Sequence, residues 1–397
     1  MKLLLHKLSP IISRIYKRKF SLILFPFYIP IAVVFYFLNF RFISLLYNRI
    51  GHLVVEPEIF FKKKQLGLYP DYKVFIYLPI NKVANKHYIL YLNKLQGITP
   101  LITKFQNFIF EPFWLFPFLR LNTRNYAIAN NETSEWSRIS KLWEGKQPIL
   151  KVDLSDQIYG KQVLDKLGLG NSWFVCFHVR EGGYSPKDEM FHSFRNANIE
   201  TYITAMNYII SLGGKCIRMG DPSMTKLPQI EGVIDYAHSD FRSDRMDVFL
   251  CATCKFFFGT SSGLANLASV FGTPLAITNI APLNMVLLPN YCDRGIFKIY
   301  RSSKNNSLLT FNEIFKNDSS NFRHTIDFIN SGIELIDNTD EEILGLCEEM
   351  LAVNNNSSFD LELQSKFKNL MNPTHYTFGA IGNIGSKFLE KYKILLN

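Results

Sequence analysis

The sequence predicts an α/β protein whose strands run parallel and whose chain forms two domains. Strand-like and helical runs alternate along most of the chain, which is typical of parallel α/β architecture. The 397 residues are enough for two or three domains of roughly 100–200 residues each. Hydrophobic residues make up 47% of the chain and charged residues 20%, so a large core can form and a disordered protein is excluded.

The first half of the chain shows this alternation less regularly than the second. Residues 146–171 contain Pro148 and three glycines, and this composition predicts a linker. The elements expected before the linker are two strands followed by two helices, at Phe42–Tyr47, Val74–Leu78, Lys86–Leu95 and Ser134–Trp143.

Beyond residue 171, strands and helices follow one another closely, which favours two Rossmann-like halves that face each other across a cleft. We place an N-terminal domain at residues 41–160, a C-terminal domain at 161–380 and a C-terminal helix at 381–397, where Lys387–Leu396 is helical in pattern. The polar segment Asn305–Ser320 is predicted as an exposed loop. The expected strands are Trp173–Val179, Lys215–Met219, Gly232–Tyr236, Lys255–Phe258 and Pro274–Thr278, and the expected helices are Ile199–Leu212, Arg245–Ala252 and Leu264–Phe271.

The first 64 residues carry almost all of the net charge. They hold eleven Lys and Arg against two Glu, a net charge of +9 out of +10 for the whole chain, which excludes a globally basic nucleic-acid-binding protein. Phe20–Phe40 is 21 residues long without a formal charge, enough for a spanning helix, although Pro26 and Pro30 would kink it. We therefore expect residues 1–40 to associate with a membrane, as a span or as a helix in the interface; the alternative is a buried core helix with a basic tail.

A histidine and an arginine close the strand expected at residues 173–179. Alternation along the strand puts His178 and Arg180 on one face at its carboxyl end, where open α/β sheets bind ligands. An arginine there offers a charged fork that suits a phosphate, and Gly182 and Gly183 let the backbone approach a ligand. The alternative is an ordinary strand end whose arginine forms a salt bridge.

Two further motifs fall near ligand-facing positions. Arg195 and Asn196 precede a helix and serve either a ligand or the turn itself. Arg218, Gly220 and Asp221 close the next strand, again at its carboxyl end. Both motifs are candidates for ligand binding.

The segment Gly259-Thr260-Ser261-Ser262-Gly263 leads from a strand into a helix, and N–H groups and hydroxyls at a helix N-terminus form an anion site. It matches neither the GxGxxG fingerprint nor the P-loop. It does match GxSxG with Ser261 as the nucleophile. A serine hydrolase is therefore an alternative, with the later acid and histidine drawn from Asp293, Asp318, His324 and His375.

The usual metal-binding patterns are missing from the sequence. No two Asp stand two positions apart, HExxH and EF-hand patterns are absent, and the one Cys-X-X-Cys, Cys251 to Cys254, has no second pair. We expect no metal and no bound cofactor. A diphosphate ligand would then be stabilised by Arg180, helix N-termini and hydroxyls.

Five motifs follow one another along the chain: Arg49-Ile50-Gly51-His52, the His178–Tyr184 segment, Arg195–Asn198, Arg218–Asp221 and Gly259–Gly263. Together they resemble a bacterial family of surface-polysaccharide glycosyltransferases, from about Ile43 to near the C-terminus. The second motif is also similar to the HxRxGD strand of GT-B fucosyltransferases, with Gly183 here in place of the aspartate.

The resemblance implies a GT-B fold, with an acceptor-binding N-terminal domain and a donor-binding C-terminal domain, and sugar transfer from a nucleotide-sugar without a metal. It implies that Arg180 holds the donor diphosphate, with the hydroxyls of the serine-rich segment beside it. The full set of expected donor-binding residues is His178, Arg180, Arg195, Asn196, Arg218, Gly220, Asp221, Thr260, Ser261, Ser262 and Gly263.

Catalysis by such an enzyme would depend on Arg180 to stabilise the leaving diphosphate and on a base for the acceptor hydroxyl. The candidate bases are Glu181, Asp188 and His52. The expected acceptor is a surface polysaccharide or a lipid-linked glycan at the cytoplasmic face of the bacterial inner membrane, where nucleotide-sugars are made. This location favours an in-plane anchor over a span. A non-catalytic nucleotide-sugar-binding component is the other open alternative.

Overall fold

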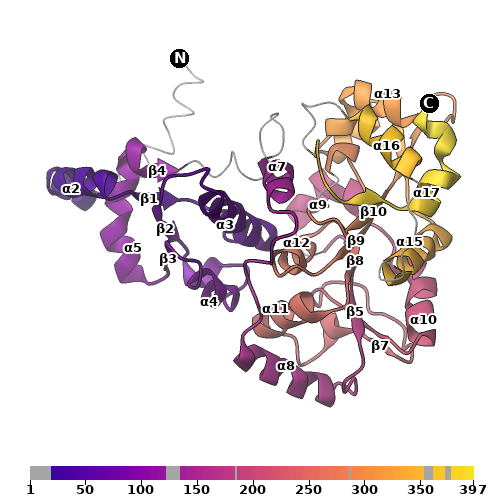
Figure 1. Ribbon diagram of the computed structural model, residues 1–397, viewed down its shortest axis with the longest axis horizontal. Coiled ribbons are helices and arrows are strands. Elements are labelled where there is room, and N and C mark those ends of the chain that lie inside the picture. Colours follow the sequence, from indigo (N-terminus) through magenta and orange to yellow (C-terminus); the bar gives the residue numbers. More distant parts are fainter. Residues whose placement is uncertain (1–18, 122–134, 184–185, 286–287, 353–360, 372–376) are drawn as a thin grey trace. The chain divides into compact units, whose positions relative to one another are not determined.

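The computed structural model describes residues 19–121, 135–183, 186–285, 288–352, 361–371 and 377–397. The chain divides into two compact units (Figure 1). Unit 1 comprises Met1–Asn48 and Lys63–Thr123, and unit 2 comprises Arg49–Lys62 and Arg124–Asn397. Each unit has its own parallel sheet flanked by helices, so the predicted parallel α/β fold is confirmed.

Unit 1 is built on a four-stranded parallel sheet with the order β3-β2-β1-β4. Its strands are β1 (Phe40–Ile43), β2 (Lys73–Tyr77), β3 (Ile98–Leu101) and β4 (Arg120–Leu121). Its helices are α2 (Lys19–Phe37), α4 (Tyr88–Leu92) and α5 (Lys104–Phe110), with 3-10 turns η1 (Ile80–Lys82), η2 (Glu111–Leu115) and η3 (Pro117–Leu119). Strand β1 therefore begins two residues before the predicted Phe42 and ends earlier.

Helix α2 contributes one of its faces to the core of unit 1. Phe25, Tyr28, Ala32 and Phe35 recur at the spacing of one helix face, and the Phe35 ring centroid lies 4.8 Å from that of Phe113. All of them belong to or pack against one hydrophobic cluster, which also includes residues of β1, β3, η2 and η3. Part of α2 is thus a core helix, which was the alternative to membrane association.

The two prolines expected to kink this segment lie inside a continuous helix, since α2 includes both Pro26 and Pro30. No helix in the described part of the chain is long and apolar enough to cross a membrane.

Unit 2 is built on a seven-stranded parallel sheet with the order β13-β10-β9-β8-β5-β6-β7. From β5 the chain adds β6 and β7 on one side, and it then returns to the other side of β5 to add β8, β9, β10 and β13. The strand order therefore reverses between β5 and β8, and open α/β sheets bind ligands at such a point, outside the carboxyl ends of the strands. The strands are β5 (Phe174–His178), β6 (Lys215–Arg218), β7 (Val233–Ile234), β8 (Phe257–Thr260), β9 (Leu275–Ile280), β10 (Arg294–Phe297) and β13 (Asn383–Ile384).

Helices cover both faces of this sheet, with α10, α15 and α17 on one face and α8, α11 and α12 on the other (Figure 1). An antiparallel pair, β11 (Ile299–Ser302) with β12 (Ile333–Ile336), adds to the unit. Its helices are α3 (Ile50–Gln65, whose last three residues group with unit 1), α7 (Glu135–Leu142), α8 (Leu154–Lys166), α9 (Pro186–His192), α10 (Ile203–Ser211), α11 (Asp244–Thr253), α12 (Gly263–Val270), α13 (Phe311–Lys316), α14 (Thr325–Asn330), α15 (Asp340–Ala352), α16 (Leu361–Leu370) and α17 (Ser386–Lys391).

The prediction of a linker at residues 146–171 is wrong, because α8 lies within it. Gly160 belongs to the packed face of this helix: a Cβ atom there would lie 2.4 Å from the ring of Phe249 in α11. The glycine therefore allows two helices to approach closely. Residues 135–160, which the sequence assigns to the N-terminal domain, group with unit 2.

The prediction of an exposed loop at Asn305–Ser320 is wrong in its second half, where α13 forms. Thr310 and Glu313 make a capping box at the start of α13, so each satisfies the other's backbone N–H. Phe311 and Phe315 are buried. The segment is short and rich in polar residues, so its two buried aromatic side chains do not stand out in the sequence.

Strand β8 approaches β5 closely at one glycine. His178 pairs with Gly259 across the two strands. A Cβ atom on Gly259 would lie 1.9 Å from the His178 carbonyl oxygen, and the φ angle of Gly259 is +150°, a value that favours glycine. A residue without a side chain is therefore required for the two strands to meet where the strand order reverses.

We expect Gly259→Ala to lower the free energy of unfolding by about 1–3 kcal/mol, because the strands must separate to admit the methyl group. Gly345→Ala in α15 is the matched control: the nearest side-chain atom is Cδ of Lys387, at 3.3 Å, and that chain is flexible. Urea unfolding measures both variants. If the free energy of unfolding of Gly259→Ala equalled that of the wild type, this result would contradict the close approach of the strands.

Candidate active site

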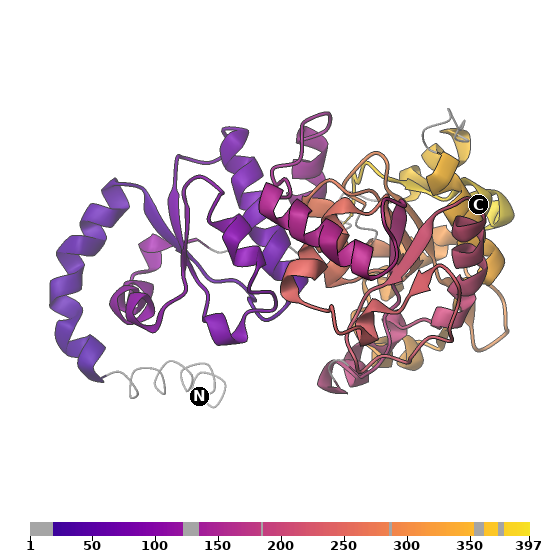
Figure 2. The same ribbon diagram turned by 90° about the horizontal axis from the view of Figure 1, so that it is seen from below.

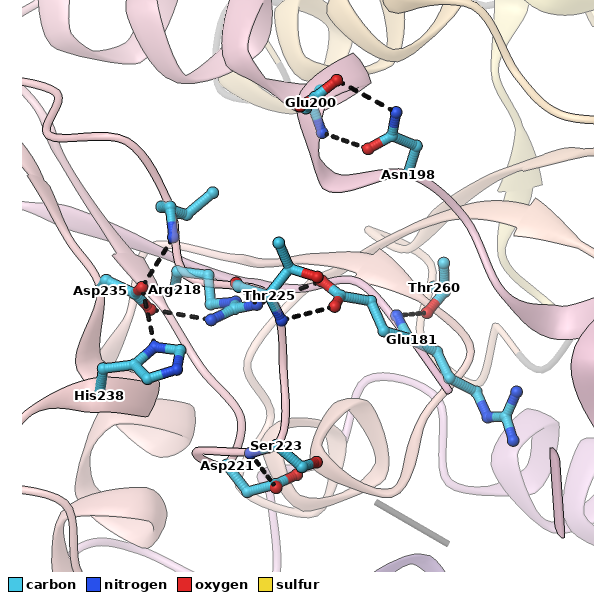
Figure 3. Close-up of polar contacts among 12 residues, drawn as sticks. Glu181, Asn198, Glu200, Arg218, Asp221, Ser223, Thr225, Asp235, His238 and Thr260 are labelled. Carbon is cyan, nitrogen blue, oxygen red and sulfur yellow. Dashed lines mark hydrogen bonds and ion pairs between the residues drawn. The ribbon is translucent and has the colours of Figure 1, made fainter. Parts of the chain in front are cut away.

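The segments that follow β5 and β8 meet where the strand order of unit 2 reverses. The backbone N–H of Arg180 donates to Thr260 Oγ1 at 2.9 Å, a bond drawn in Figure 3. Thr260 is buried, whereas Ser261 and Ser262 after it are partly exposed. Two motifs that lie 80 residues apart in the sequence are therefore side by side at the edge of the sheet where the carboxyl ends of the strands lie.

The guanidinium of Arg180 is positioned by α9 and by the turn after it. Its Nη1 donates to the His192 carbonyl oxygen at 2.9 Å and to Asn196 Oδ1. The same nitrogen lies 3.6 Å from Glu189 Oε2, and Asn196 Nδ2 donates to Glu189 Oε1 at 2.5 Å. The guanidinium of Arg180 is therefore held by several contacts, while 19% of the side chain stays exposed.

A buried lysine holds Asn196 in turn. Lys298, between β10 and β11, donates from Nζ to the Asn196 carbonyl oxygen at 2.6 Å and forms an ion pair with Asp337 at 2.6 Å. Burial lowers the pKa of the Lys298 ammonium, although Asp337 opposes this shift. The sequence does not predict Glu189 or Lys298 as part of the site. The one signal for Lys298 is a single charge inside an apolar run, Gly295–Tyr300.

The serine-rich loop is anchored by Arg195 and capped by Ser262. Arg195 Nη2 donates to the Ser261 carbonyl oxygen at 2.7 Å. Ser262 is the N-cap of α12, and its Oγ accepts from the Ala265 N–H at 3.3 Å. The first turn of α12 is therefore directed toward the same edge of the sheet, where the partial positive charge of a helix N-terminus favours an anion.

The start of α3 lies against the start of α12. A Cβ atom on Gly263 would lie 2.9 Å from the Gly51 backbone nitrogen. His52, next in the chain, has Nδ1 2.7 Å from Oε1 of Glu56, one turn further along α3. Glu56 is 3% exposed, and its Oε2 has no hydrogen-bond partner among the described residues. The arrangement is a histidine oriented by a buried carboxylate.

His178, the last residue of β5, is held neutral. Burial, and after it the positive charge of Arg218, lowers the pKa of the imidazole to about 4. Its Nδ1 has no hydrogen-bond partner among the described residues. At neutral pH the ring therefore offers uncharged hydrogen-bonding atoms at the edge of the sheet.

Arg218 is fully buried and forms ion pairs with two carboxylates. Nη1 lies 2.9 Å from Asp235 Oδ1, and Nη2 lies 3.2 Å from Glu181 Oε1 and donates to the Thr225 carbonyl oxygen at 2.8 Å (Figure 3). Glu181 also accepts the Thr225 N–H at 2.8 Å. Arg218 therefore supports the site from the interior. Glu181, one of the candidate bases, has both carboxylate oxygens engaged.

Gly220 and Asp221 shape the turn after β6. Asp221 Oδ1 accepts the Ser223 N–H at 2.9 Å (Figure 3). Gly220 has a φ of +144°, and a Cβ atom on it would lie 2.1 Å from Met224 Sδ, so a side chain does not fit there. Asp188, another candidate base, lies in α9, and its side chain is outside the described ones.

Of the residues considered for the alternative hydrolase triad, Asp293 lies at the opposite end of the sheet from Ser261. Asp293 precedes β10 and accepts the Leu275 N–H at 2.9 Å at the amino end of β9, whereas Ser261 follows β8 at the carboxyl ends of the strands. His324 caps α14, and its ring stacks on that of His192 at 5.7 Å. His375 lies outside the described residues.

The Cys-X-X-Cys pair belongs to the core. Cys251 and Cys254 are buried, and Cys254 Sγ donates to the Cys251 carbonyl oxygen at 3.6 Å. Burial raises the pKa of the Cys251 thiol well above its ordinary value. Within the described ranges, no group of three or more His, Cys, Asp or Glu side chains is placed to hold a metal ion.

No protein-family model matches the chain, and no curated protein matches its sequence. Among solved structures it is similar to an ADP-heptose LPS heptosyltransferase II from E. coli, with 11% identity over 79% of this chain and 99% of that chain and a TM-score of 0.48. A family 9 glycosyltransferase from Veillonella parvula has 11% identity, coverages of 60% and 80% and a TM-score of 0.37. A spinosyn forosaminyltransferase has 10% identity, coverages of 90% and 99% and a TM-score of 0.32. All three of these proteins are glycosyltransferases.

We expect Arg218→Ala to lower the free energy of unfolding by about 3–5 kcal/mol, because the largely buried carboxylates of Glu181 and Asp235 would lose the cation that lies between them. Arg301→Ala is the control. Arg301 forms an ion pair of similar length with Glu334, 2.6 Å, but both side chains are exposed, so the expected loss is about 0–1 kcal/mol. Chemical denaturation measures both variants, and an equal loss of unfolding free energy in Arg218→Ala and Arg301→Ala would contradict a structural role for Arg218.

Proposed function

We propose that the chain is a glycosyltransferase that moves a sugar from a nucleotide-sugar donor to a glycan acceptor. One observation carries the proposal: the backbone N–H of Arg180 donates to Thr260 of the serine-rich loop before α12, at the point where the strand order of the unit 2 sheet reverses. This edge of a parallel sheet is where nucleotides bind in open α/β proteins. Its residues offer the charge and the hydrogen-bond donors that a diphosphate requires.

The chemistry follows from where negative charge develops. As the bond between the anomeric carbon and the diphosphate oxygen breaks, the leaving nucleoside diphosphate gains negative charge. The Arg180 guanidinium and the first N–H groups of α12 stabilise that charge, because they are held in place before the reaction begins. His178, kept uncharged by its pKa of about 4, adds a hydrogen bond without a further charge. No divalent metal is needed in this scheme.

The contacts beneath Arg180 keep it in position. Asn196 holds the guanidinium, and Lys298 holds the backbone of Asn196. Glu189 balances part of the charge from 3.6 Å. When a diphosphate binds, Arg180 exchanges a distant carboxylate for a closer and more highly charged partner, which favours binding.

We expect Arg180→Gln to weaken donor binding by at least roughly tenfold, which is about 1.4 kcal/mol, because the charged fork is lost while a hydrogen-bonding side chain remains. A thermal-shift screen of the full chain with UDP-, GDP-, CMP-, dTDP- and ADP-linked sugars, in EDTA, first identifies the donor. The variant is then titrated with that donor.

Arg301→Gln, at the exposed ion pair, is the matched control and binds the donor as the wild type does. If Arg180→Gln bound the donor with the wild-type affinity, this result would contradict the proposed diphosphate site. A donor that binds normally but is never consumed in the presence of acceptor glycans would instead indicate a non-catalytic binding component.

His52 is our choice among the candidate bases. Its Nδ1 faces Glu56 at 2.7 Å, so with the proton on Nδ1 the lone pair of Nε2 is left to accept the proton of the acceptor hydroxyl. The acceptor oxygen then forms the new bond to the anomeric carbon as the diphosphate leaves. The imidazolium that results is stabilised by the buried Glu56 carboxylate, which is a positioning residue here.

We expect His52→Ala to reduce kcat for release of nucleoside diphosphate roughly 100- to 10,000-fold, and Glu56→Gln to reduce it by about tenfold. Both variants keep the wild-type affinity for the donor, which a general loss of structure would not. Glu58→Gln, which disrupts the Glu58–Lys62 ion pair of 2.6 Å on the same helix, is the control and leaves kcat unchanged. A wild-type kcat in His52→Ala would exclude His52 as the base.

The proposed acceptor is a surface polysaccharide or a lipid-linked glycan, reached at the cytoplasmic face of the bacterial inner membrane. Two properties support this part of the proposal. Nucleotide-sugars are produced in the cytoplasm, and the basic, apolar N-terminal segment suits an anionic membrane surface.

A further inference from the structure

Helix α2 of unit 1 has two apolar faces, and only one of them packs against other residues that the structure describes. The inner face, with Phe25, Tyr28 and Phe35, packs on the core cluster of the unit. Figure 2 shows α2, the indigo helix, running along one side of the unit 1 sheet. A helix held along its length in this way can present only its opposite face to a partner.

The opposite face of α2 is exposed and strongly apolar. Phe27 is 71% exposed and Phe37 is 77% exposed, and Ile31 and Val34 between them are about half exposed. We call these four residues the outer face of α2. They occupy successive turns of the helix. Soluble monomers rarely leave such a contiguous apolar surface uncovered, so it marks a site of interaction.

The 3-10 turn η3 extends this surface. Phe118 is 44% exposed, and its ring meets that of Tyr36 in α2 edge-on at 5.6 Å. Two exposed basic residues, Arg120 after η3 and Lys104 at the start of α5, belong to the same unit. Aromatic and basic side chains together are the composition of surfaces that bind the interface of an anionic bilayer.

The division of charge between the units supports a lipid partner. Unit 1 holds 15 Lys and Arg against two Asp and Glu, a net charge of +13, so the rest of the chain, unit 2, has a net charge of −3. The positive charge is therefore gathered in the unit that carries the exposed apolar face. A second copy of the chain would bring another strongly positive unit to this face, and the two would repel each other.

We propose that the outer face of α2, together with Phe118, is a docking surface for an anionic lipid bilayer. The helix lies in the plane of the interface. Its outer side chains enter the boundary between headgroups and acyl chains, and the lysines and arginines of unit 1 contact anionic headgroups. This inference goes beyond donor chemistry, and it rests on the proposed function only in taking the acceptor to be a glycan held at that membrane.

The test is flotation of the full chain with vesicles of phosphatidylcholine alone and of phosphatidylcholine mixed with phosphatidylglycerol. The wild type is expected to bind the mixed vesicles at low salt and to dissociate at high salt, because headgroup attraction is screened. The double variant Val34→Asp, Phe37→Asp is expected to lose binding by a factor on the order of ten or more. The control, Leu361→Asp with Ile394→Asp, places two charges on unit 2 at positions that are each 72% exposed, and it binds as the wild type does.

Folding and donor chemistry are checked separately. Val34→Gln with Phe37→Gln is a milder pair that keeps the surface uncharged, and it is expected to weaken flotation in the same direction. The thermal shift with donor reports on unit 2 and is expected to be unchanged in every α2 variant. A failure of donor binding would therefore affect the proposed function and leave the flotation result intact.

Either of two results would overturn the docking proposal. One is wild-type flotation in both α2 variants. The other is a wild-type protein that does not bind the mixed vesicles and instead forms a dimer through this face. Conversion of that dimer to a monomer by Val34→Asp, Phe37→Asp would show that the face forms the dimer interface.

Discussion

The parallel pairing of β5 with β8 is the constraint on which the rest of unit 2 depends. These two strands meet where the strand order reverses, and they can do so because Gly259 leaves room for the His178 carbonyl oxygen. The bond from the Arg180 N–H to Thr260 Oγ1 then aligns the segments that follow both strands. Every other feature of the candidate site, including the start of α12, is positioned relative to this junction.

The three arginines near the junction differ in what surrounds them, and this difference decides what each can do. Arg218 is fully buried between carboxylates and contributes to stability. Arg195 is committed to the Ser261 carbonyl oxygen and fixes the loop. Arg180 keeps part of its surface exposed while a network ending at Lys298 holds it still. A side chain that is held in place and partly exposed suits a charged ligand, because the fold has already fixed its conformation before the ligand binds.

The sequence predicts the junction well because its signals are local. The apolar runs of β5 and β8 end at glycines and hydroxyl residues, and the carboxyl ends of neighbouring parallel strands share one edge, so Arg180 and Ser261 are expected to be close. It does not predict Glu189 or Lys298. Lys298 reaches Asn196 across 102 residues of chain, and nothing near it in the sequence marks that contact.

The role of one glycine explains why the prediction of a linker at residues 146–171 is wrong. The glycines of residues 146–171 suggest a linker, but Gly160 is there so that α8 can pack on Phe249. Composition alone does not separate a glycine that frees the backbone from one that allows close packing. The N-terminal segment shows a second limit of what the sequence can predict. Its apolar pattern is plain in the sequence, yet only the structure divides it into a face used by the core and the outer face of α2.

The central claim is that a nucleotide-sugar binds where β5 and β8 end. Amide hydrogen exchange of the full chain, with and without the donor identified by thermal shift, tests it most directly, because the binding site is located without any mutation. The account predicts slower exchange at residues 178–182 and 259–266, the two segments that surround the proposed diphosphate site. Protection confined to unit 1, or to strands of unit 2 distant from this junction, would contradict it.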